Sequence, residues 1–162
     1  MTTGDGASAG NAGSNSRAST LARILRIFEM IAGRTVYLAL LNENAAALRR
    51  LVELCAHSQF LADQIAARPL LLDELIDARL IEEAPTRAQF AADLANIRDR
   101  MQGEDPEHQV DILRQFQSAA TFRVAVADLT AGLPLMKVSD RLTDIAELIV
   151  QETLSLAWAQ IG

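Results

Sequence analysis

The fold is decided by residues 105–158, which read DPEHQVDILRQFQSAATFRVAVADLTAGLPLMKVSDRLTDIAELIVQETLSLAW. Apolar side chains recur there at helical spacing on both sides of a break at residues 131–134, Ala-Gly-Leu-Pro. The stretch predicts two long helices, the first of which reaches Thr130 and is about 39 Å long at about 1.5 Å per residue. The second runs to Trp158. We therefore expect a helical hairpin in the core of an all-α bundle.

The core of this hairpin is predicted from its apolar stripes. Asp105 should cap the first helix, with Pro106 at its first position. The expected inner residues are Val110, Leu113, Phe116, Ala120, Val124 and Ala127 on the first helix, and Leu142, Ile145, Ala146, Ile149 and Thr153 on the second. Truncating Leu142 to Ala should consequently destabilise the fold sharply.

The preceding chain predicts shorter helices with recognisable ends. Asn44, Ser58 and Thr86 are expected caps, Gln89 completes a capping box, and Pro69 opens a short helix. The expected buried stripes are Leu21, Ile24, Leu25, Phe28 and Ile31, then Leu48, Leu51, Val52 and Cys55, then Phe90, Leu94, Ile97 and Met101, while Arg49, Arg50 and Glu53 should face outward.

The two ends of the chain differ in composition. Residues 1–20 are mostly small and polar, so we expect a disordered tail or linker there, followed by one helical domain over 21–162. The last residues, from Trp158, continue an apolar helix. An apolar helix at this end fits a segment of a longer protein and a stand-alone helical protein about equally well.

Overall composition bounds the function. The 162 residues are 50% hydrophobic but only 4% aromatic, and the net charge of −6 argues against nucleic-acid binding. The single cysteine, Cys55, excludes an intramolecular disulfide framework and fits a reducing cytoplasm. No apolar run has the roughly 18 residues of a membrane span, and the start of the chain does not resemble a signal peptide.

No catalytic, cofactor-binding or metal-binding residue is predicted. Cys55 and His57 lack further ligands nearby, and His108 stands in a solvated first turn beside acids. The acidic groups are Asp73-Glu74, Glu82-Glu83 and residues 104–107, and the last of these is explained by helix capping.

Four charged residues of the hairpin have roles that the sequence leaves open. Arg123 and Asp128 interrupt an apolar helix, so each should meet a partner on another helix or face solvent; a buried structural pair is the simplest reading. Lys137 and Asp140 are three residues apart and are expected to form a local ion pair.

Three long stretches carry a family resemblance: residues 33–44 (GRTVYLALLNEN), 47–77 (ALRRLVELCAHSQFLADQIAARPLLLDELID) and 113–150 (LRQFQSAATFRVAVADLTAGLPLMKVSDRLTDIAELIV). Beyond its tail, the chain resembles the glutamine synthetase adenylyltransferase family. The matching motifs are Tyr37–Leu41, Arg68–Leu75, Arg123–Asp128 and Lys137–Asp140. Gln117 departs from the lysine that is common in the family.

The resemblance implies a bifunctional enzyme with two nucleotidyltransferase halves. One half transfers AMP from ATP to a tyrosine of glutamine synthetase, and the other removes it by phosphorolysis. Mg²⁺, glutamine synthetase and PII-type proteins are the implied cofactor and partners. This chain would be the helical segment between the halves, which lacks the family's catalytic glycine–serine and paired aspartates, and we expect it to be inactive alone.

That interpretation leads to one further expectation, and one alternative to it stays open. If an absent catalytic domain covers the last helix in the whole enzyme, Leu156 and Trp158 should be exposed here and the chain should self-associate. The alternative is a stand-alone helical adaptor for protein interactions with no enzymatic role.

Overall fold

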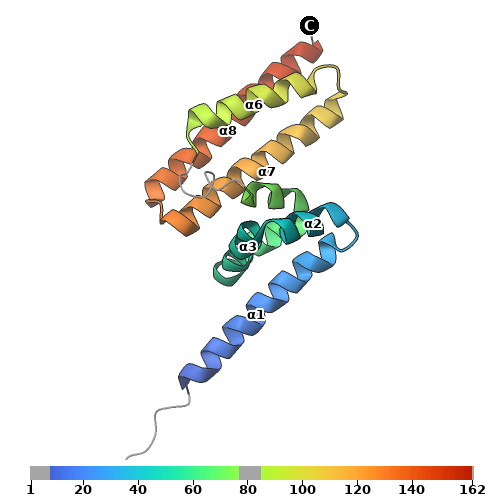
Figure 1. The fold of residues 1–162 in the computed structure, drawn as a ribbon. Coiled ribbons are helices and arrows are strands. Elements are labelled where there is room, and N and C mark those ends of the chain that lie inside the picture. Colours follow the sequence, from blue (N-terminus) through green and yellow to red (C-terminus); the bar gives the residue numbers. More distant parts are fainter. Residues whose placement is uncertain (1–7, 77–84, 162) are drawn as a thin grey trace, which may run out of the picture. The chain divides into compact units, whose positions relative to one another are not determined.

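The computed structural model describes residues 8–76 and 85–161, and every element in these ranges is helical (Figure 1). The predicted all-α class is confirmed. The chain divides into two compact units, Met1–Ile76 and Asp77–Gly162, each with a core of its own. The single helical domain over 21–162 stays a prediction. Within the described ranges, no helix combines the length and apolar character that crossing a membrane requires.

The first unit consists of one long helix and four short ones. They are α1 (Ser8–Ile31), α2 (Thr35–Glu43), α3 (Ala45–His57), α4 (Gln59–Ala67) and the 3₁₀ helix η1 (Pro69–Leu75). The helix α1 packs on α3 and α4, and η1 packs on α4 and α3. The side chains fully enclosed between them include Ile27, Ile31, Leu51, Cys55, Ile65, Leu72 and Leu75.

Capping ends the short helices where the sequence predicted. Asn44 Oδ1 accepts a hydrogen bond from the Ala47 backbone N–H at 3.1 Å, and Ser58 Oγ accepts one from Leu61 N–H at 3.2 Å. Pro69 stands at the start of η1. Each capping oxygen satisfies an N–H group that the helix itself leaves without an acceptor. These caps are confirmed.

The helix α1 differs from its prediction at both its start and its buried face. It begins at Ser8 rather than at Leu21, while residues 1–7 lie outside the described part. Extending an existing helix is easier than nucleating one, and the alanines of this stretch favour helix, which accounts for the early start. The buried face is centred on Ile27 and Ile31, whereas Leu21 and Leu25 are more than half exposed.

Arg50 corrects a second expectation in this unit. It was assigned to the outer face of its helix, but it is half-buried and its Nη1 donates to the backbone oxygens of Leu75 at 2.6 Å and Ile76 at 3.3 Å. The guanidinium thus caps the C-terminal end of η1, whose last carbonyls have no partner within the helix. Val52, predicted to be buried, is exposed.

The second unit contains α6 (Arg87–Met101), α7 (Pro106–Ala131) and α8 (Leu135–Ile161), each packed against the other two. The predicted hairpin is confirmed: α7 and α8 run side by side in opposite directions (Figure 1). Gly132 ends α7 in the left-handed conformation at φ 60°, which a glycine adopts without the Cβ clash of other residues.

The predicted core of this unit is right for α7 except at Val110, which is exposed, and it is shifted on α8. Val124 and Ile145 are buried and Ile149 is half-buried, but Leu142 is 41% exposed, and Ala146 and Thr153 also face outward. Helical periodicity fixes the spacing of a stripe but not which of two neighbouring stripes meets the partner helices. The buried cluster comprises Phe90, Leu94, Met101, Leu113, Phe116, Ala120, Val124, Ile145 and Leu148.

Candidate functional site: the polar network of α6 and α8

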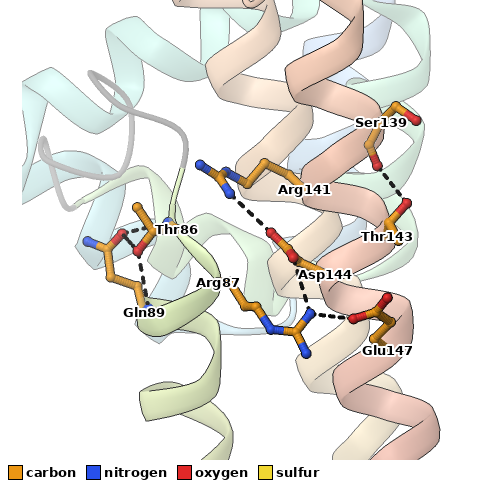
Figure 2. A network of polar contacts seen from close by, with 8 residues as sticks. All are labelled: Thr86, Arg87, Gln89, Ser139, Arg141, Thr143, Asp144 and Glu147. Atoms are coloured by element: carbon orange, nitrogen blue, oxygen red, sulfur yellow. Dashed lines mark hydrogen bonds and ion pairs between the residues drawn. The ribbon is translucent and has the colours of Figure 1, made fainter.

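A capping box fixes the first turn of α6 (Figure 2). The Thr86 backbone N–H donates to Gln89 Oε1 at 2.7 Å, and the Gln89 backbone N–H donates to Thr86 Oγ1 at 3.3 Å. The sequence predicted this pair. Because both partners are local, the box defines the first turn of α6 and holds the next residue, Arg87, in helical backbone geometry.

Arg87 joins the start of α6 to two carboxylates on α8 (Figure 2). Its Nη1 donates to Glu147 Oε2 at 2.6 Å and to Asp144 Oδ1 at 3.2 Å. The other Asp144 oxygen, Oδ2, accepts from Arg141 Nη1 at 3.0 Å. Hydrogen bonds from Arg87 to Glu147, and next to Asp144, raise the pKa of the Arg87 guanidinium. The Arg87 guanidinium is therefore held in its charged form.

This network is suited to holding two helices together rather than to catalysis. The Asp144 carboxylate lies between two guanidinium groups, which compensate its charge and occupy both of its oxygens. The nearby Thr143 hydroxyl donates to the backbone oxygen of Ser139 at 2.9 Å, one turn earlier in the same helix. The arrangement ties the start of α6 to α8.

A second ion pair joins the same two helices deeper in the unit. Arg98 Nε donates to Glu152 Oε1 at 3.0 Å and Oε2 at 3.1 Å, and Nη2 also contacts Oε2. Only 3% of the Glu152 side chain is exposed, against 56% for Arg98. The hydrogen bonds to Glu152, followed by its charge, raise the pKa of Arg98. A buried carboxylate needs this compensation, and the two-point contact fixes its orientation.

The open role of Arg123 is resolved by a contact with another helix. Its Nη2 donates to Asp93 Oδ2 on α6 at 2.7 Å, and its guanidinium carbon lies 5.3 Å from the centre of the Phe90 ring. The expectation of a partner on another helix is confirmed. Asp128 faces solvent. Lys137 and Asp140 are exposed, and the expected ion pair between them is absent from the described contacts, so that expectation was wrong.

Cys55 and His57 do not come together as a reactive pair. Cys55 is fully enclosed, and burial raises the pKa of its thiol to about 11, although the nearby charge of Arg23 opposes the shift. A thiol in this state is a poor nucleophile, because the thiolate is the reactive form. His57 lies exposed in the last turn of α3.

The remaining titratable candidates stand at the surface. His108 Nε2 lies 3.9 Å from Glu104 Oε2, with both side chains about half exposed. Asp73 is exposed on η1, and Glu82-Glu83 lie outside the described residues. No group of three or more His, Cys, Asp or Glu residues that could hold a metal ion occurs in the part of the chain that the structure describes. The prediction of no site residues stays a prediction.

The sequence did not indicate a surface hollow that lies among the described residues of the first unit. Its volume is about 540 Å³, and the lining is mostly apolar with Glu43 as the charged member. The other lining residues are Val36, Ala39, Leu40, Asn44 and Ile76. The hollow could accommodate an apolar group by its shape, but its single carboxylate does not make a pair of groups for general acid–base catalysis.

Sequence reasoning missed the arginines and acids that join the helices of the second unit. Arg98 and Glu152 are 54 residues apart, and Arg87 and Glu147 are 60 apart, so no local pattern links them. One signal was available: Glu152 falls seven residues after Ile145, on the same face as the core. An acid on a core stripe indicates a basic partner on a facing helix.

Comparisons with known proteins agree with the resemblance. Residues 48–162 match the family described as glutamate-ammonia ligase adenylyltransferase. The chain belongs to this family. The matched range contains all of α6, α7 and α8, so the polar network lies in the family's own sequence.

Curated relatives support the assignment. A bifunctional glutamine synthetase adenylyltransferase/adenylyl-removing enzyme of Mannheimia succiniciproducens is 47% identical over 141 residues, which cover 87% of this chain and 14% of the relative. Enzymes of the same description from Pasteurella multocida and Pseudomonas putida are 45% and 46% identical over similar ranges, again 14% of each relative. The chain thus corresponds to a small part of the length of its relatives.

Proposed function

We propose that this chain is the helical scaffold segment of a bifunctional glutamine synthetase adenylyltransferase/adenylyl-removing enzyme. The whole enzyme would adjust nitrogen metabolism by transferring AMP from ATP to a tyrosine of glutamine synthetase and by removing it. The observation that carries the proposal is the identity of about 45% with enzymes of this description over most of the chain.

The chemistry of the described residues supports a scaffold role within that enzyme. The carboxylates of Asp144, Glu147 and Glu152 are engaged by arginines, and each of these contacts joins two helices. Carboxylates that bind catalytic metal ions must instead converge on one point with oxygens available. ATP and Mg²⁺ would therefore be bound by other parts of the full-length enzyme, with none held by this segment.

The proposed partners follow from the family. Glutamine synthetase is the protein that the relatives' names identify, and a PII-type protein is the regulator that the resemblance implies. We place the enzyme in the cytoplasm, which agrees with the free thiol of Cys55. Neither a nucleic-acid partner nor a membrane is part of the proposal.

A direct test is to incubate the chain with labelled ATP, Mg²⁺ and glutamine synthetase. The synthetase should stay unmodified with this chain and become labelled with the full-length Mannheimia succiniciproducens enzyme as positive control. Labelling by the chain alone would contradict the scaffold assignment and require a catalytic site.

One observation favours a second candidate, an adaptor for protein interactions without enzymatic function. Several large apolar side chains on α8 are exposed, Trp158 by 80%, and such surfaces bind other proteins. Sequencing the DNA downstream of the codon for Gly162 distinguishes the two. A continuing frame with a glycine–serine and paired aspartates supports the enzyme segment, and a stop codon followed by an unrelated gene supports the adaptor.

A further inference from the structure

We draw no further inference here: the strongest candidate, the exposed apolar face of α8 formed by Val150, Leu154 and Trp158, carries no proposal because nothing in the structure shows what covers it.

Discussion

The two units are stabilised by different uses of arginine. In the first unit, Arg23 and Arg50 donate to backbone oxygens, those of Cys55 and Leu75, both at 2.6 Å. In the second unit, Arg98 and the arginines at 87 and 123 bind carboxylates on other helices. The first unit has one arginine–carboxylate pair, Arg26–Asp63, among its described contacts, and that pair is exposed.

Helix length explains this difference. Apart from α1, the helices of the first unit are 7 to 13 residues long, while α7 and α8 have 26 and 27 residues. Each helix end leaves four backbone groups without a helical partner, so short helices offer many carbonyls to a donor. A unit built of long helices has fewer helix ends for its size. Its helices instead face one another over a long surface, where charged side chains can meet across the interface. Arginine side chains thus bind backbone carbonyls at helix ends in the first unit and carboxylates on facing helices in the second.

The largest expected effect is on the apolar interface of the long helices. Ile145→Ala should lower the free energy of unfolding of the second unit by about 2–5 kcal/mol, because it leaves a cavity in an enclosed cluster. Leu142→Ala, at an exposed position of the same helix, should cost far less. Urea denaturation of both variants at a concentration where the chain is monomeric measures the difference. Equal losses of stability in the two variants would mean that α8 is rotated about its own axis relative to the orientation described here.

The next effect concerns the buried carboxylate. Arg98→Ala should destabilise the second unit by about 2–3 kcal/mol, less than for a fully buried pair because Arg98 is half exposed. Replacing Glu152 with Leu in the same variant should recover most of the loss, since no uncompensated charge remains. Arg114→Ala, which removes an exposed pair with Asp111, is the matched control and should change little. Equal effects at Arg98 and Arg114 would contradict the assignment of Glu152 as buried.

A smaller loss is expected at the helix ends of the first unit. Arg50→Ala should cost about 1–2 kcal/mol, because the part-buried Leu75 carbonyl at the end of η1 and the exposed Ile76 carbonyl after it lose their donor. Arg49→Ala, at an exposed neighbouring position, serves as the control. Hydrogen exchange should show faster opening of η1 and α3 in Arg50→Ala and unchanged protection in α6–α8. Loss of protection in both units alike would contradict their description as separate structures.

The smallest effect is a pH dependence in the first unit. Burial raises the pKa of Cys55 from 9.0 to about 11, so the folded unit retains a proton that the unfolded chain loses between these values. Stability from this source is fully present below pH 9 and falls as the pH rises toward 11, by about 1 kcal/mol at pH 10. Denaturation of the wild type and Cys55→Ala at pH 8 and pH 10 isolates the contribution. A wild type that loses no more than the variant would show that the thiol is not enclosed.

Helix-capping signals were read correctly from the sequence. Asn44, Ser58, Thr86 with Gln89, and Asp105 with Pro106 all cap helices as predicted, because a cap involves residues only two or three positions apart. The break at Gly132 was equally clear, since a left-handed residue is needed there. Helix ends that carry a capping residue or a terminal glycine, and with them the all-α class and the hairpin, are therefore encoded over short distances.

Long-range features could not be derived in the same way. The stripe containing Leu142 and the stripe containing Leu148 have the same helical spacing, and only contacts with α6 and α7 decide that Leu148 is buried. The carbonyls that receive Arg50 are 25 and 26 residues away in sequence. Ion pairs and carbonyl caps between helices depend on tertiary packing, which periodicity in a single sequence does not specify.

The most direct test of the scaffold assignment is a chimera of the Mannheimia succiniciproducens enzyme in which the 141 matched residues are replaced by those of this chain. A scaffold needs to preserve its packing rather than supply reacting groups. We therefore predict a folded chimera that still transfers AMP to glutamine synthetase and removes it, at rates within about tenfold of the parent, a loss of about 1.4 kcal/mol in activation free energy. A chimera that folds with the parent's stability but neither transfers nor removes AMP would contradict the assignment.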